Sequence, residues 1–234
     1  MMNEILTAGL AEWNLSSDET MLAQLNEFAV RVLETNKVMN LTAITEPDEF
    51  ARKHFLDCAS LLTVHDFSGK TVIDVGCGAG FPGMPLKLLC PSCDITLLDA
   101  LGKRIRFLQE CIDGMNLTGI EAVHARAEEF AAKHRGQYDI AVSRAVAKLN
   151  ILAELSLPMV KKGGWFIAMK SVDSDEEIQQ SKHAIAVLGA EIQSIRDVTI
   201  PGTEITHRLV MIHKTKDTPK QYPRRFQKIS ASPL

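Results

Sequence analysis

Three glycines, Gly76, Gly78 and Gly80, have the type and spacing that most clearly predict a ligand site. They directly follow Asp74 in a short run rich in β-branched residues, Thr71–Val75. Glycines at such a position let a ligand approach the backbone closely and let the chain turn sharply into a helix. The ligand is a triphosphate, a dinucleotide or another cofactor, unless the glycines serve the turn alone.

The spacing of the glycines separates these ligands. A triphosphate-binding P-loop needs Gly-x4-Gly-Lys-Ser/Thr, but the first lysine after the glycines is Lys87, so this reading is rejected. A dinucleotide site favours Gly-x-Gly-x-x-Gly, and Phe81 stands where the third glycine belongs, which weakens this reading. The segment from Asp74 to Gly80 instead resembles motif I of class I S-adenosylmethionine-dependent methyltransferases. The glycines of that motif pack against the methionine part of the cofactor.

Two acidic residues follow at the ends of the next two predicted strands. Asp99 ends the apolar run Ile95–Leu98, where its carboxylate can accept hydrogen bonds from ribose hydroxyls. The alternative for Asp99 is a helix N-cap. Ala127 is small enough to lie against an adenine, and Glu128 can reach the exocyclic amine of that base. The alternative for Glu128 is an ordinary acid in the first turn of a helix.

The fourth strand end carries Arg144, in the segment VSRAVAKLN. Enzymes that methylate the exocyclic amines of adenine or cytosine usually have Asn/Asp-Pro-Pro-aromatic here, and carbon-methylating pyrimidine enzymes need a nucleophilic cysteine. This segment has neither. An arginine offers a planar surface for stacking and a fork of hydrogen-bond donors.

Strands that alternate with helices must position these residues. The pattern predicts an α/β fold with a Rossmann-like, mostly parallel sheet. The predicted strands are Thr71–Val75, Asp94–Leu98, Glu121–Ala125, Tyr138–Ser143 and Trp165–Lys170. The predicted helices are Gly83–Cys90, Lys103–Asn116, Ala127–His134 and Lys148–Leu157. Two later β-rich segments, 190–200 and 204–214, have no room for a helix between them, so they predict an antiparallel C-terminal hairpin at one sheet edge.

Three regions follow from this pattern. Residues 1–66 are predicted to be an N-terminal helical extension, with a capping box at Ser16 and Glu19 and a further helix over 45–62. Residues 67–214, extending to about 216, form the core, and residues 217–234 form a basic tail. The sequence contains neither an apolar run long enough to span a membrane nor a signal peptide, which predicts a cytoplasmic protein.

Composition restricts the partners and the chemistry further. The formal net charge is −3, so global basicity does not attract nucleic acid, although a local basic patch is compatible with this value. The five cysteines are an odd number and are expected to be reduced thiols. Cys90 and Cys93 have CxxC spacing, but without a second pair the sequence predicts no metal site.

Eight blocks carry a resemblance that covers most of the chain from about Glu34 to Arg225. They are ETNKVMNLTAIT, KHFLDCASLL, VIDVGCGAGFPGMPLKL, LLDALGKRIRFL, RAEEF, SRAVAKLNIL, a block around KKGGWFIAMK, and TPKQYPRR. The chain resembles the bacterial 16S ribosomal RNA guanine-N7 methyltransferases, also called glucose-inhibited division protein B. Three departures are Cys77 in motif I, AMKS after the fifth strand, and a tail without the family's glycine-containing pattern.

The resemblance implies the activity and the cofactor. S-adenosyl-L-methionine would donate a methyl group to N7 of a guanine in the 530 loop (ribosomal numbering) of 16S ribosomal RNA, free or in the small subunit. Cofactor contacts are implied for Gly76, Phe81, Ala127, Glu128 and Arg144, with Gly78 in the same motif and Asp99 expected from the wider class. Guanine N7 already carries a lone pair, so no general base is assigned. A monomer is expected.

Other residues are candidates for the substrate pocket. Asn40 lies in the NLT segment, and His54 and Asp57, three residues apart, would share one helix face. The alternative is that these two residues join the helical region to the sheet. Lys170, at a strand end, either contacts RNA or is solvated. The tail cations Lys214, Lys216, Lys220, Arg224, Arg225 and Lys228, with Tyr222 and Phe226 among them, predict an RNA-contacting arm or else a solvated tail.

Competing activities remain open from the residues alone. One is a methyltransferase of the same class that acts on another RNA or base. A second is a nicotinamide-dependent oxidoreductase, against which Phe81 argues. A third is a non-catalytic RNA-binding protein, against which the complete set of Asp74, Asp99 and the three glycines argues.

Overall fold

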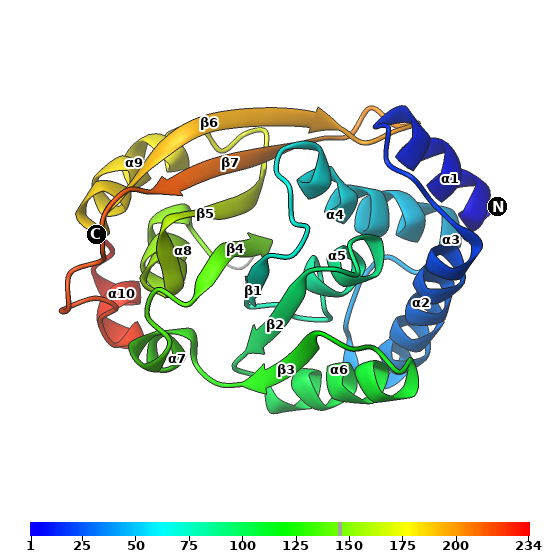
Figure 1. Ribbon diagram of the computed structural model, residues 1–234, viewed down its shortest axis with the longest axis horizontal. Helices are drawn as coiled ribbons and strands as arrows, with labels where there is room; N and C mark the ends of the chain where they lie inside the picture. Colours follow the sequence, from blue (N-terminus) through cyan, green and yellow to red (C-terminus); the bar gives the residue numbers. More distant parts are fainter. Residues whose placement is uncertain (145–146) are drawn as a thin grey trace.

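In the computed structural model, which describes residues 1–144 and 147–234, seven strands form one sheet in the order β3-β2-β1-β4-β5-β7-β6 (Figure 1). The strands are β1 Thr71–Val75, β2 Asp94–Asp99, β3 Ile120–His124, β4 Tyr138–Arg144, β5 Val160–Ser171, β6 Ala190–Thr199 and β7 Thr206–Lys214. Ala145 and Val146, inside the SRAVAKLNIL block, lie outside the described residues.

Strand pairing confirms the predicted architecture. Strands β1 to β5 pair in parallel, and β7 lies antiparallel to both β5 and β6, so the predicted hairpin forms one edge of the sheet. The strand order reverses between β1 and β4. In open α/β sheets, ligands bind at the carboxyl ends of the strands beside such a reversal.

Helices cover both faces of the sheet. The helical segments on one face are α1 Met2–Glu12, α2 Glu19–Met39, α3 Pro47–Phe50, η1 Ala51–Leu56, α4 Asp57–Ala59, η2 Ser60–Thr63, α5 Gly83–Leu89 and α6 Gly102–Gly114. Those on the other face are α7 Ala127–Lys133, α8 Leu149–Ser156, η3 Leu157–Met159, α9 Asp175–Val187 and α10 Phe226–Ala231. Successive strand residues point to opposite faces, so Val72 enters one apolar cluster and Ile73 the other.

One local prediction for the helices was wrong, and two helices were missed. Helix α2 begins at Glu19, and Asp18 is its N-cap, accepting a hydrogen bond from the Met21 amide (2.8 Å), so Ser16 and Glu19 do not form a capping box. Aspartate caps helices as well as serine does. The helix predicted over residues 45–62 is present as consecutive helical segments from Pro47 to Thr63, with Pro47 in the first turn, and it includes the π-helical stretch η1. Helices α9 and α10 were not predicted.

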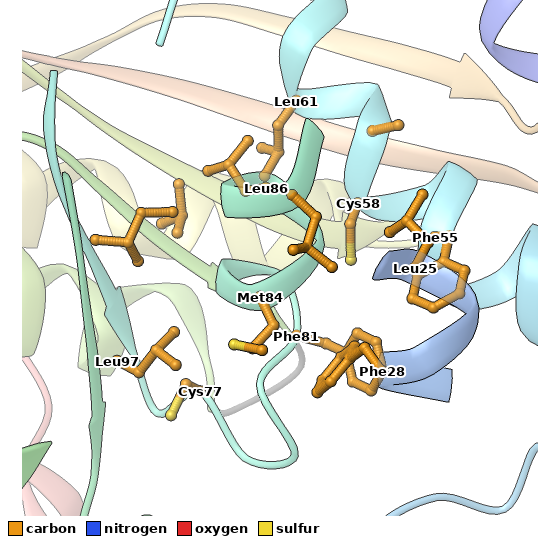
Figure 2. Close-up of a cluster of buried hydrophobic side chains, with 14 of the residues drawn as sticks. Leu25, Phe28, Phe55, Cys58, Leu61, Cys77, Phe81, Met84, Leu86 and Leu97 are labelled. Carbon is orange, nitrogen blue, oxygen red and sulfur yellow. The ribbon is translucent and has the colours of Figure 1, made fainter. Parts of the chain in front are cut away.

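The N-terminal helices share a core with the glycine loop. Phe81 follows that loop, and its ring lies 5.6 Å from the ring of Phe28 in α2, 5.9 Å from Phe50 in α3 and 6.5 Å from Phe55 in η1, measured between centroids. Figure 2 shows Phe28 and Phe55 near Phe81, with Met84 of α5 close by. The N-terminal region is therefore part of the structure that shapes the loop.

Candidate active site

A cavity of about 480 Å³ lies at the carboxyl ends of β1, β2, β3 and β4. This volume is typical of small-molecule sites. Residues from all four strand ends line it, together with Leu41, His54, Leu155 and Phe226 from the helices and the loop after α2. All the residues predicted to bind a cofactor line this one cavity: Gly76, Gly78, Phe81, Asp99, Ala127, Glu128 and Arg144.

The glycine loop has a backbone that only glycine adopts easily. Gly76 and Gly78 line the cavity with φ of 74° and 59°, in the left-handed region that disfavours side chains. Gly80, at φ 97°, also needs the absence of a side chain, since a Cβ there would lie 2.7 Å from Leu108 Cδ2 and 2.8 Å from Met84 Cγ. The glycines therefore allow the loop to approach a ligand on one side and the core on the other.

Backbone amides of this loop are directed into the protein. The amides of Gly76 and Cys77 both donate to the carbonyl of Leu98, and those of Gly80 and Phe81 donate to the carbonyl of Cys77. At the start of α5, the Gly83 amide donates to the buried Asp74 carboxylate at 2.8 Å. A phosphate site needs amides that point at the ligand. This loop is therefore unsuited to bind a pyrophosphate or triphosphate.

Asp99 is held at the cavity wall by two backbone donors. Its Oδ2 accepts from the Gly78 amide (2.9 Å) and its Oδ1 from the Leu101 amide (2.8 Å). Arg104 Nη1 lies 3.6 Å from Oδ2. Asp99 is not the N-cap of α6, because that position is Leu101. Each carboxylate oxygen has a second lone pair, so Asp99 can still accept hydrogen bonds from a ligand's hydroxyl groups.

The β3 end of the cavity is mostly apolar, with one carboxylate. Ala125, Ala127, Leu155 and Phe226 all line the cavity at this end. Glu128 lines it too, and its Oε1 accepts from Arg126 Nε at 2.7 Å. This arrangement suits a flat apolar group that carries a hydrogen-bond donor.

Arg144 joins the sheet to the N-terminal helices through an ion pair. Its Nη1 donates to Asp57 Oδ2 at 2.8 Å and its Nη2 donates to His54 Nδ1 at 3.0 Å. The guanidinium carbon lies 5.1 Å from the centroid of the Phe81 ring, which also stacks on His54 at 4.3 Å. The Asp57 side chain is 3% exposed, so it neutralises Arg144 from the buried side.

Hydrogen bonds determine the protonation state of His54. Its Nδ1 accepts from Arg144, so the proton is on Nε2, which donates to Thr42 Oγ1 at 2.8 Å. Burial, and after it the charge of Arg144, lowers the pKa of His54 to about 3. His54 is therefore a neutral residue with both ring nitrogens engaged, which makes it a poor general base.

His207, in β7, also contacts Asp57. Its Nδ1 donates to Asp57 Oδ1, and this hydrogen bond raises the pKa of His207 above its ordinary value. Asp57 thus accepts from His207, which lies 150 positions further along the chain, and on its other oxygen from Arg144, 87 positions further along.

Asp74 ends up beneath the glycine loop, fully buried. Its Oδ2 accepts from Gly83, but its Oδ1 has no hydrogen-bond partner among the described residues. Burial raises the pKa of Asp74 to about 7, against the smaller lowering effect of the Gly83 amide. Asp74 therefore fixes the start of α5 and does not line the cavity.

Three other candidates lie away from the cavity wall. Asn40 is exposed and ends α2 in the left-handed conformation, with φ 51°. Asp57 stands behind Arg144 and does not line the cavity. Lys170 pairs with Glu177 Oε1 at 2.6 Å and donates to the Ala147 carbonyl, so the structure gives it the contacts of a structural residue.

The C-terminal tail is ordered, so the solvated-tail alternative is wrong. Buried Lys214 donates to the carbonyls of Leu157 and Leu188, and Arg224 pairs with fully buried Glu154. The RNA-contacting interpretation is therefore wrong for Lys214 and Arg224. The remaining tail cations, Lys216, Lys220, Arg225 and Lys228, are exposed.

Sequence reasoning missed three residues that the structure brings to the site. Thr42, His207 and the pocket role of Phe226 depend on contacts between distant parts of the chain. Only Thr42 had a local signal, because it lies in the NLTAIT segment. In the structure, the Thr42 amide donates to Asn36 Oδ1 at 2.9 Å, which holds the loop that contains this segment. The described residues contain no group of three or more His, Cys, Asp or Glu side chains arranged to hold a metal ion.

Comparisons with known proteins agree with this geometry. The family model for rRNA small subunit methyltransferase G (GidB) matches residues 21–206. Two relatives described by the same name are similar over 98% of this chain and 98% of their own, those of Alkaliphilus metalliredigens (46% identical) and of Clostridium botulinum strain ATCC 19397 (44%). The solved structure of M. jannaschii TYW2 in complex with AdoMet has a TM-score of 0.54 at 13% identity, over 68% of this chain and 74% of that one. This last likeness concerns the fold alone.

Proposed function

Because the chain belongs to the GidB family of rRNA small subunit methyltransferases, we propose that it methylates N7 of a guanine in the 530 loop of 16S ribosomal RNA. The chain is an S-adenosylmethionine-dependent rRNA methyltransferase, and its fold is that of the class I enzymes.

The residues that line the cavity fit S-adenosylmethionine. Gly76 and Gly78 offer close backbone approach for the methionine part, Asp99 offers acceptors for the ribose hydroxyls, and Ala127 with Glu128 suits the adenine. The loop amides supply the single observation that favours this cofactor over a nicotinamide dinucleotide. They donate to Leu98, Cys77 and Asp99 instead of pointing at a ligand's phosphates.

The chemistry asks little of the protein beyond alignment. S-adenosylmethionine supplies an electrophilic methyl group, and guanine N7 already has a lone pair. No side chain must remove a proton, which agrees with a neutral His54 whose two nitrogens are occupied. Holding the two reactants in line can contribute several kcal/mol of rate acceleration.

Arg144 is the residue through which we propose that the site orients its reactants. Asp57, His54 and the Phe81 ring fix its guanidinium in one plane at the cavity wall. A fixed guanidinium can pair with the cofactor's carboxylate or stack on the target base. Asn40 and Lys170, which lie away from the cavity wall, are proposed to act only in the fold or in contacts with RNA outside the cavity.

The RNA substrate also bears on location and assembly. No described helix is long and apolar enough to cross a membrane. We propose that the protein acts in the cytoplasm, where ribosomal RNA is found, and that it does so as a monomer. Sedimentation of the purified protein would test the monomer, and a stable dimer at micromolar concentration would exclude it.

Methyl transfer to ribosomal RNA tests the proposal. Small subunits from cells that lack this protein are incubated with it and with tritium-labelled cofactor, and the labelled base is mapped. The expected label is on N7 of one guanine in the 530 loop. Label on another base or in another RNA would refute the proposed target.

Arg144→Lys tests the proposed role of the guanidinium in the same assay. Lysine keeps the charge but loses the planar fork, so we expect at least a tenfold loss of transfer with a folded protein. Arg52→Lys is the matched control, because Arg52 bonds the Pro201 carbonyl (2.9 Å) away from the cavity. Equal transfer by both variants would remove Arg144 from the site.

A further inference from the structure

The C-terminal segment 215–234 is attached to the catalytic core by buried polar contacts. Arg224 Nε and Nη2 donate to the two oxygens of Glu154, at 2.8 and 2.6 Å, and the Arg224 amide donates to Oε1 at 2.8 Å. Glu154 is fully buried in α8. A buried carboxylate satisfied by three donors fixes the segment in one position.

Further contacts hold the segment on both sides of this ion pair. Arg135, in the loop after α7, donates to the carbonyls of Tyr222 and Thr218. Ile229 in α10 is fully buried in the same apolar cluster as Leu152 of α8. Figure 1 shows α10 beside α7 and α8, at the end of the molecule where the chain terminates. These contacts are those of a structural element.

The segment places one side chain at the cavity. Phe226, the first residue of α10, lines the β3 end together with Ala127 and Leu155. The guanidinium of Arg126 lies 4.9 Å from the centroid of its ring, and Arg126 also pairs with Glu128 at 2.7 Å. Phe226 is thus positioned both by its own helix and by the side chain of Arg126.

The side chains at the β3 end of the cavity favour one class of ligand. An aromatic ring with small and apolar neighbours favours a flat heteroaromatic base. The Glu128 carboxylate accepts hydrogen bonds only, so it favours a base with an amino group. Asp99 ends β2, the strand next to β3, and its carboxylate can accept hydrogen bonds from the sugar of the same nucleoside.

We propose that Phe226 binds the adenine of S-adenosylmethionine, so that the C-terminal segment is a wall of the cofactor site. This inference rests on the proposed function. It assigns the segment a task different from the RNA contacts that its lysines and arginines predict. The exposed cations Lys220, Arg225 and Lys228 remain free for RNA, whereas Phe226 and Arg224 serve the cofactor pocket.

Binding of two ligands, measured by calorimetry on the full-length protein, tests the inference. The ligands are S-adenosylhomocysteine and methylthioadenosine, which keeps the nucleoside but lacks the amino acid. Stacking of one base contributes about 1–3 kcal/mol, which corresponds to about a 5- to 150-fold change in Kd. Phe226→Ala is expected to weaken both ligands by a factor in this range, because both contain adenine.

Three further variants separate stacking from folding. Phe226→Leu keeps an apolar side chain in the cluster and should bind both ligands weakly, whereas Phe226→Trp keeps an aromatic face and should bind close to wild type. Gln227→Ala is the matched control, since Gln227 is exposed in the same helix and does not line the cavity. It should bind both ligands as wild type does.

The outcomes distinguish this inference from the proposed function. If the wild type fails to bind S-adenosylhomocysteine, the proposed function is refuted. If the wild type binds S-adenosylhomocysteine, and Phe226→Ala or Phe226→Leu binds both ligands as tightly as the wild type does, only the role of Phe226 is refuted. A loss confined to S-adenosylhomocysteine, with methylthioadenosine unaffected, would also overturn it, because Phe226 would then act on the amino-acid end.

Discussion

Replacing Asp57 by asparagine tests whether the buried ion pair with Arg144 holds the N-terminal helices on the sheet. The substitution keeps the shape of the side chain and removes its charge. Arg144 is only 17% exposed and Asp57 3%, so water cannot replace the lost counter-charge. Breaking a buried pair by changing one partner costs about 3–5 kcal/mol.

The structure places the expected cost near the lower end of that range. The asparagine oxygen can still accept from either Arg144 or His207, but its amide group then faces the other donor. Arg144 also keeps two acceptors, His54 Nδ1 and the Lys53 carbonyl. We therefore expect the free energy of unfolding to fall by ~3 kcal/mol at pH 7, measured by urea denaturation.

Glu27→Gln is the matched control, because it makes the same change in the exposed i,i+4 pair with Arg31 on α2. Such pairs contribute about 0.3–0.5 kcal/mol. A loss below about 1 kcal/mol for Asp57→Asn, indistinguishable from this control, would refute a stabilising role for the buried pair.

The pKa of His207 gives a second measure of the same interaction. The hydrogen bond to Asp57 raises the pKa of His207 in the folded protein. The stability gained from protonated His207 is therefore complete below the pKa that His207 has in the unfolded chain, and it is lost as pH rises through the folded-state pKa. The difference in stability between wild type and Asp57→Asn should therefore shrink as pH rises through that value. Titration of His207 by NMR should show a lower pKa in the variant, and an unchanged pKa would contradict the contact.

Two other predictions concern the glycine loop and the acid beneath it. Gly76→Val should abolish binding of S-adenosylhomocysteine without unfolding the protein, because a β-branched residue at φ 74° is strained and intrudes on the cavity; normal binding in calorimetry would exclude the loop from the site. For Asp74→Asn, the folded-state pKa of about 7 lies above the unfolded value of 3.8, so the wild type should lose stability relative to the variant as pH rises from about 4 to 7. Parallel stability curves across this range would show that Asp74 has an ordinary pKa.

The part of the chain in which strands alternate with helices was predictable, because the sequence patterns that indicate these elements are local. Each strand from β1 to β4 ends at, or within three residues before, a residue that lines the crevice, so Gly76, Asp99, Ala127 and Arg144 could be assigned to one cavity from the sequence. Periodicity and turn residues depend on near neighbours in the sequence. The carboxyl ends of parallel strands then meet at one edge whatever the details of packing.

The roles of the other site and tail residues could not be predicted, because they depend on contacts between distant parts of the chain. Lys170 and Lys214 look like solvated lysines in the sequence, yet each is held in the protein by carbonyls or a carboxylate. His207 reaches Asp57 across 150 positions. The tail's density of cations predicted an RNA-contacting arm, but Glu154, fully buried in α8, binds one of those cations.

Phe226 follows every described strand of the sheet in the sequence, so the cavity is completed only after the whole sheet has been synthesised. A ribosome makes the chain from the N-terminus, and domains begin to fold as they emerge. A nascent chain that has reached β7 contains every strand of the sheet, the glycine loop and Asp99, but its β3 end is still open. Products truncated before Arg224 would contain every described strand of the sheet but lack Phe226, so the proposed role of Phe226 predicts that they bind the cofactor more weakly.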